Sequence, residues 1–236
     1  MAPRTGPRAP RTAAPAIALL ALLALVACAG PSASTGEALA RADLRAGLAA
    51  RGASLLGQGQ VPFRVGKERF PPDCTGFVEA VYAAEGIPLR RLMERAAPRA
   101  TSGVAAAWAA VGRYGERWRG GAWPEPGDLV FFDDTWDRNG DGKADDPFTH
   151  VGLVEWVDAR GTVTFLHRGG RGVARAVMTL DRRGPVRGRD GQPLNDFLRA
   201  RGAPSNGDLG LTGELFAGFG RIEPARIERA RLAAGR

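Results

Sequence analysis

Residues 73–85 read Asp-Cys-Thr-Gly-Phe-Val-Glu-Ala-Val-Tyr-Ala-Ala-Glu, and the interpretation of the whole chain starts from them. Asp73 suits the N-cap of a helix, and Gly86 suits the position after its last turn. The apolar side chains between them recur at the spacing of one helix face: Phe77, Val78, Val81 and Tyr82. The stretch therefore predicts a helix that places Cys74 in its first turn.

Cys74 is a candidate nucleophile because of this position. Helix N-terminal N–H groups and the helix dipole lower a thiol pKa, and they can hold an oxyanion. A nucleophilic thiol also needs a base, and the only histidines are His150 and His167. His150 opens one expected strand and His167 ends the next, so a hairpin would bring the two imidazoles together. We expect a Cys-His-His site, although each residue taken alone also fits a structural role.

The order of the expected elements favours an α+β fold in which N-terminal helices pack on an antiparallel sheet. The expected helices are 37–56, 74–85, about 90–112 and a short one near 195–201; the expected strands are 127–132, 151–157, 162–166, 173–180 and 215–222. Residues 57–72 are expected to be a loop or a short extended piece, residues 183–210 mostly loop, and residues 223–236 a polar helical tail. We therefore predict one domain over 37–222.

The N-terminal residues predict export. Three arginines precede an unbroken apolar run at 16–27, which is too short to span a bilayer but matches a signal-peptide core. The run ends in Leu-Val-Ala-Cys28, which resembles the lipobox of bacterial lipoproteins, where the cysteine is lipidated. We expect a signal peptide at 1–27, a tether at 28–36 and a lipid anchor on Cys28. Ala29 favours the outer membrane, facing the periplasm; the alternative is an ordinary secretory signal.

Composition excludes several classes of protein. The chain has 236 residues, with 33 Lys and Arg against 25 Asp and Glu, and only two cysteines. Two cysteines exclude a disulfide scaffold, and two histidines exclude a multi-histidine metal cluster. The basic residues are scattered arginines, so we expect no nucleic-acid partner. We expect a monomer with no cofactor for catalysis.

Four motifs in order resemble the NlpC-type cell-wall peptidases, which are papain-like cysteine hydrolases. The motifs are Asp-Cys-Thr-Gly-Phe-Val at 73–78, Pro-Gly-Asp-Leu-Val-Phe-Phe at 126–132, His-Val-Gly-Leu-Val at 150–154 and Leu-His at 166–167. The resemblance implies that Cys74 is the nucleophile, His150 the general base and His167 the residue that orients it. It also implies a papain-like fold and cleavage of amide bonds in peptidoglycan stem peptides.

The same resemblance implies a substrate subsite. Asp73 and Thr75 match positions that line it and hold the free amine of the peptide. Phe63 stands where the family has a substrate-binding tyrosine, and residues 134–149 are an insert between the motifs. Two alternatives stay open: an amidase or endopeptidase of the related CHAP branch, and a catalytically silent, calcium-stabilised lipoprotein that binds peptidoglycan.

The insert resembles a calcium loop, because oxygen-bearing side chains alternate around Gly142. Side-chain ligands would come from Asp137, Asn139, Asp141 and Asp145, and a backbone carbonyl from Lys143. Phe148 takes the place of the closing glutamate, and Asp146 or Asp134 would have to substitute for it. We predict a structural calcium ion that stiffens the approach to His150; the alternative is a solvated Asp/Gly turn.

Overall fold

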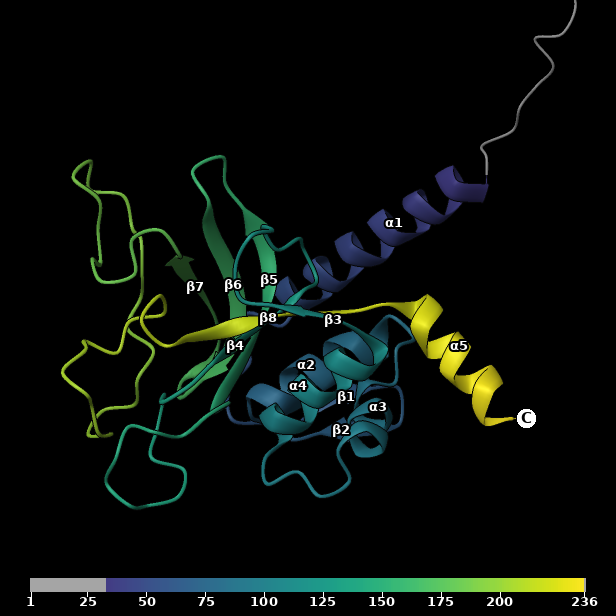
Figure 1. The fold of residues 1–236 in the computed structure, drawn as a ribbon, viewed down its shortest axis with the longest axis horizontal. Coiled ribbons are helices and arrows are strands. Elements are labelled where there is room, and N and C mark those ends of the chain that lie inside the picture. The colour runs from purple at the N-terminus through teal and green to yellow at the C-terminus, as the bar shows by residue number, and fades with distance from the viewer. Residues whose placement is uncertain (1–32, 236) are drawn as a thin grey trace, which may run out of the picture. The chain divides into compact units, whose positions relative to one another are not determined.

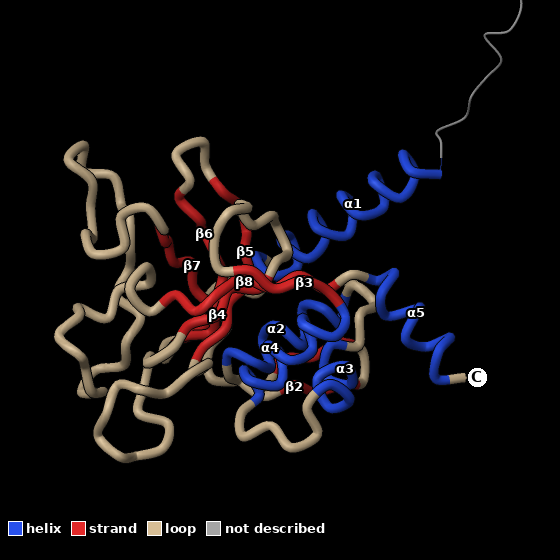
Figure 2. Tube along the Cα trace, viewed as in Figure 1, coloured by secondary structure: helices blue, strands red, loops and turns tan. Residues whose placement is uncertain are grey.

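The computed structural model describes residues 33–235, which form five helices and eight strands (Figures 1 and 2). In chain order they are α1 (Ala33–Ala53), β1 (Phe63–Val65), β2 (Glu68–Phe70), α2 (Cys74–Ala84), α3 (Leu89–Ala96), α4 (Gly103–Tyr114), β3 (Gly115–Trp118), β4 (Leu129–Phe132), β5 (His150–Val157), β6 (Thr162–Gly169), β7 (Gly172–Thr179), β8 (Phe216–Ile222) and α5 (Pro224–Ala234). The mixture of helices with an antiparallel sheet fits the predicted α+β class.

Six strands form one antiparallel sheet in the order β3-β8-β4-β5-β6-β7. Strands β4 to β7 are neighbours in chain order, as expected of successive hairpins. In the β5–β6 hairpin, Gly152 lies opposite His167. Because side chains alternate between the two faces, His150 lies on the same face as Gly152 and is a diagonal neighbour of His167.

Helices α2 and α4 cover one face of this sheet (Figure 1). Phe77 of α2 is fully buried in a core shared with Leu153 of β5 and Leu166 of β6. The apolar face that periodicity predicts on α2 is therefore the face that fixes this helix against the sheet. Packing of that face also holds Cys74, the first residue of α2, close to the ends of the strands.

The other face of the sheet carries a second core, in which Phe132 and Phe165 pack with Leu215 and Leu198. The segment after β7 reaches this core and is hydrogen-bonded to the edge strand. Val177 N–H donates to the carboxylate of Asp196 at 2.8 Å, and Asp196 N–H donates to the Val177 carbonyl at 3.2 Å. Those side-chain and backbone bonds replace helix formation, so the helix expected near 195–201 is absent.

One expected helix is corrected, and two short strand regions add to the expected elements. The helix expected over 90–112 is two helices, because Pro98 disfavours helical backbone at Ala97 and Ser102 then caps α4 by accepting from Ala105 N–H at 3.1 Å. Residues 57–72, expected to be a loop or a short extended piece, contain the extended β1–β2 hairpin. The sequence patterns do not predict strand β3, whereas the expected helical tail is present as α5.

The described residues fall into two units, with the boundary between Ala38 and Leu39 inside α1. The predicted signal peptide at 1–27 and the lipidated Cys28 lie outside the described residues. Residues 33–36, expected in the tether, belong to α1 instead. Among the described residues, no helix combines the length and the apolar character needed to cross a membrane.

Candidate active site

Cys74 is the first residue of α2, and the turn before it is fixed by two features. The Asp73 carboxylate caps the helix by accepting from Gly76 N–H at 2.7 Å. Gly76 lies so close to the preceding turn that a Cβ there would be 2.1 Å from the Pro71 carbonyl oxygen. The cap and the close approach together set the direction in which Cys74 leaves the turn.

The two histidines lie side by side, as the hairpin argument predicts. His150 Nε2 and His167 Nδ1 are 3.0 Å apart, within hydrogen-bonding distance. Phe132 packs near the His150 ring and Phe165 near the His167 ring. These aromatic neighbours hold the imidazoles in place and shield their hydrogen bond from water.

Cys74 and His150 line one cavity of about 410 Å³. Asp73 and Thr75, both expected in a substrate subsite, line it as well. Sequence reasoning missed the remaining wall, which includes Ser102, Trp136, Phe148, Thr149 and Arg168. His167 is not part of the wall but contacts His150 from behind, so it can act on a bound molecule only through His150.

Burial governs the protonation of all three residues. Desolvation raises the pKa of Cys74 to about 11, against smaller opposing effects of hydrogen bonds from Val151 N–H and from Thr75. Burial lowers the pKa of His150 well below its usual value, and that of His167 to about 4. The expected low thiol pKa is therefore wrong for the resting site, because desolvation outweighs the helix terminus. At neutral pH the thiol and both imidazoles are uncharged.

A comparison with models of known protein families gives a match over the part of the chain that contains the candidate site. Residues 65–169 match the family model of the CHAP domain. This domain type is a cell-wall peptidase or amidase related to the NlpC and papain-like cysteine peptidases, and it indicates a peptidoglycan hydrolase. No curated protein matches the chain, and no solved structure matches it either. The matched range contains Cys74, His150 and His167, and it includes the insert.

Phe63 does not line the cavity, and it lies two residues before the start of the matched range. Phe63 is 1% exposed and packs against Phe77, with ring centroids 5.9 Å apart. The expectation that Phe63 binds substrate is corrected, because its ring belongs to the core under α2. An apolar ring without a hydroxyl gains more from burial there than from a place at the cavity wall.

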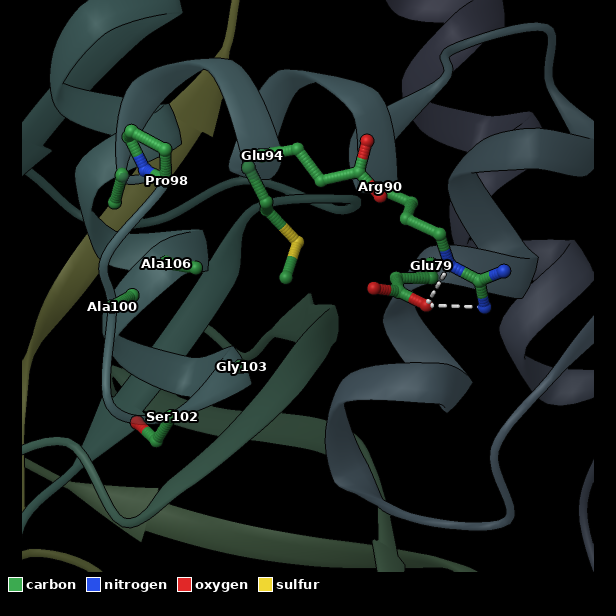
Figure 3. A pocket seen from close by; sticks show the side chains of 10 residues that line it. Glu79, Arg90, Glu94, Pro98, Ala100, Ser102, Gly103 and Ala106 are labelled. Carbon is green, nitrogen blue, oxygen red and sulfur yellow. Dashed lines mark hydrogen bonds and ion pairs between the residues drawn. The ribbon is translucent and has the colours of Figure 1, made fainter.

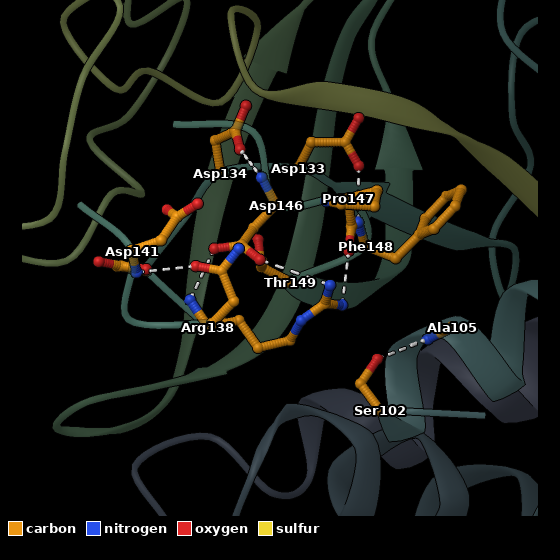
Figure 4. Close-up of polar contacts among 12 residues, drawn as sticks. Ser102, Ala105, Asp133, Asp134, Arg138, Asp141, Asp146, Pro147, Phe148 and Thr149 are labelled. Atoms are coloured by element: carbon orange, nitrogen blue, oxygen red, sulfur yellow. Dashed lines mark hydrogen bonds and ion pairs between the residues drawn. The ribbon is translucent and has the colours of Figure 1, made fainter. Parts of the chain in front are cut away.

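The insert at 134–149 is held by its own hydrogen bonds (Figure 4). Asp133 accepts from Phe148 N–H at 2.7 Å, and Asp134 accepts from Asp146 N–H at 2.6 Å. Asp146 in turn accepts from Arg138 N–H at 2.7 Å. These bonds join the two ends of the insert immediately before His150, so they fix the residue at which β5 begins.

The residues predicted to bind calcium make turns in this structure. Asp137 accepts from Gly140 and Gly142 N–H, and Asp141 accepts from Lys143 N–H. Asn139 accepts from Asp141 N–H. Between residues 33 and 235, no group of three or more His, Cys, Asp and Glu is placed to hold a metal ion. Calcium binding at 137–145 stays a prediction.

A second cavity, of about 450 Å³, shares Ser102 and Gly103 with the first (Figure 3). Two of its three charged residues form an ion pair: Arg90 donates to the Glu79 carboxylate at 2.8 and 3.0 Å, and Glu94 is the third. Burial raises the pKa of Glu79, and the bonds from Arg90 oppose that rise. Ser102 and Gly103, at the start of α4, thus lie between the two cavities.

Proposed function

We propose that this protein is a cysteine peptidase that hydrolyses amide bonds in peptidoglycan stem peptides, with a papain-like site. The supporting observation is that Cys74 and His150 line one cavity while His167 Nδ1 lies 3.0 Å from His150 Nε2. A nucleophile, a base and a group that orients the base are the parts that acyl transfer needs. Their position inside a CHAP domain agrees with this chemistry.

The roles of the two imidazoles determine which ring nitrogen carries the proton. For His150 to accept the thiol proton at Nδ1, its Nε2 must carry a hydrogen, which it donates to Nδ1 of His167. His167 is then a positioning residue that selects the tautomer and orientation of His150. Both rings are neutral at rest because burial lowers their pKa values.

The reaction starts when the Cys74 sulfur attacks the amide carbonyl carbon and its proton passes to His150. N–H groups at the start of α2 stabilise the negative charge on the carbonyl oxygen. The C–N bond then breaks, and His150 gives the proton to the leaving amine, which leaves a thioester on Cys74. Water attacks the thioester, with His150 taking one of its protons. The C–S bond breaks to release the acid, and the sulfur regains its proton.

The test is hydrolysis of purified muropeptides followed by mass spectrometry. We expect the wild-type protein to release two peptide fragments and Cys74→Ala to release none while keeping its fold. Undiminished hydrolysis by Cys74→Ala would contradict the proposal. The second candidate is an amidase that cleaves the bond between the glycan and the stem peptide, as the CHAP domain also allows. The masses distinguish the two, because an amidase yields an intact stem peptide.

We also propose the anchor and the calcium site that the sequence predicts. Cys28→Ala should abolish incorporation of a labelled fatty acid in a bacterial host, whereas Cys74→Ala should not.

Calcium at a hundred times its Kd should stabilise the fold by about 2.7 kcal/mol. A melting temperature that is the same in Ca²⁺ and in chelator would remove the calcium proposal.

A further inference from the structure

We propose that Arg168 binds a carboxylate of the substrate, which makes the protein selective for peptides with a free carboxylate near the cleaved bond. This inference rests on the proposed function and names its substrate class. Arg168 is 5% exposed and lines the cavity that contains Cys74 and His150. Its Nε and Nη2 are buried and have no hydrogen-bond partner among the described residues.

The position of Arg168 on β6 directs its side chain toward the helices. Side chains alternate along a strand, so Arg168 lies on the same face as Leu166 and on the face opposite His167. Leu166 packs in the core beneath α2, and so does Val173, which pairs with Arg168 across β6 and β7. The guanidinium therefore lies on the side of the sheet where α2 begins with Cys74.

Three other arginines whose side chains are mostly buried each have an acidic partner: Arg138, Arg199 and Arg221. Arg221 donates to Asp128 at 2.7 and 2.8 Å, and Arg199 pairs with Asp208. Arg138, which also lines the cavity, donates to the Pro147 carbonyl and pairs with Asp146. A buried guanidinium without a partner is costly, so Arg168 is the exception that calls for a ligand.

The unpartnered N–H donors of Arg168 indicate the chemistry of the ligand that would bind there. A guanidinium presents N–H groups in a planar fork that matches a carboxylate, and Nε with Nη2 is one edge of that fork. The other charged groups of the cavity already have partners: Asp73 caps α2, and Arg138 is tied to the insert. Stem peptides carry carboxylates beside their amide bonds, so the proposed substrate supplies the group that Arg168 lacks.

The experiment compares two muropeptides that differ only in this group, one with a free α-carboxylate next to the cleaved bond and one with a carboxamide. Wild type is expected to show a KM roughly 10- to 100-fold lower for the carboxylate peptide, the range of charge-assisted hydrogen bonds. Arg168→Gln should raise KM for the carboxylate peptide by that factor and leave the carboxamide peptide unchanged. Arg171→Gln is the matched control, because Arg171 is exposed on the following turn.

A structural role for Arg168 gives different results. Loss of a structural arginine would lower the melting temperature, whereas removal of an unpartnered buried charge should leave it unchanged or raise it. Removal of a charge beside His167 would also shift the pH profile of kcat, but equally for both peptides. The ratio of the two KM values therefore isolates contact with the carboxylate.

Two outcomes overturn the inference: equal KM for the two peptides in wild type, or a preference that survives Arg168→Gln. Failure of the proposed function is distinguishable, because wild type would then hydrolyse neither peptide. In that case, or if Arg168→Gln does not fold, calorimetric binding of both peptides to Cys74→Ala decides the matter. Tighter binding of the carboxylate peptide supports the inference, and equal binding removes it.

Discussion

Replacement of His167 by alanine tests whether this residue positions the base. The hydrogen bond that would be lost is 3.0 Å long and shielded by Phe132 and Phe165. When His150 takes the thiol proton, that bond becomes charge-assisted and contributes about 1.5–3 kcal/mol. We therefore expect His167→Ala to lower kcat by roughly 10- to 100-fold. KM should change little, because His167 does not line the cavity.

His167→Asn is the matched variant, since its side-chain carbonyl can accept the same hydrogen from His150. It should recover most of the kcat that His167→Ala loses. Steady-state hydrolysis of a muropeptide measures both parameters, and a thermal melt shows whether each variant is folded. Full activity in His167→Ala would refute the reasoning. Equal losses in two folded variants would also do so, because the effect would then come from packing and not from the hydrogen bond.

Gly76→Ala should lower the free energy of unfolding by about 3 kcal/mol, since its Cβ would lie 2.1 Å from the Pro71 carbonyl oxygen; a urea titration that shows a loss below about 1 kcal/mol would contradict this close approach. The melting temperature should fall as the pH drops from 7 toward 4, because the unfolded chain binds protons below about pH 6.5. The folded chain takes up the proton on His167 only near pH 4, so stability is lost across that interval; His167→Asn should reduce the fall, and an unchanged profile would contradict burial of a neutral imidazole. Alkylation of Cys74 by iodoacetamide should accelerate steadily from pH 7 to 9, because its thiol pKa is about 11; a plateau below pH 7 would reveal a thiolate at rest.

The helix that begins at Cys74 and the pairing of the two histidines could be predicted because their signals are local. An N-cap, an apolar periodicity and a glycine stop define α2 within 14 residues, from 73 to 86. A two-strand hairpin with one histidine at each end fixes their proximity almost regardless of the rest of the fold. The scarcity of histidine left no other pair to choose.

Properties that depend on the whole surroundings of a residue could not be predicted. The thiol pKa follows from desolvation by several segments, and a helix position alone points in the opposite direction. Phe63 is apolar and follows a loop, so the sequence could not tell a cavity wall from the core. Arg168 at the end of a strand is typical of a solvated residue, whereas in the structure it is 5% exposed, with Nε and Nη2 unpartnered among the described residues.

The resting site contains an uncharged nucleophile and an uncharged base, yet one wall carries an unpartnered positive charge. The Cys74 thiol keeps its proton because its pKa is far above that of His150, so an ion pair forms only as the sulfur attacks. The N–H groups at the start of α2 then face the oxyanion, and His167 faces the imidazolium of His150. Both contacts stabilise charges that exist only during the reaction. A substrate carboxylate bound at Arg168 would hold the substrate's amide bond against the Cys74 sulfur while the sulfur attacks. Recognition and chemistry thus depend on different faces of β6: Arg168 lies on the face beneath α2, and His167 lies on the opposite face.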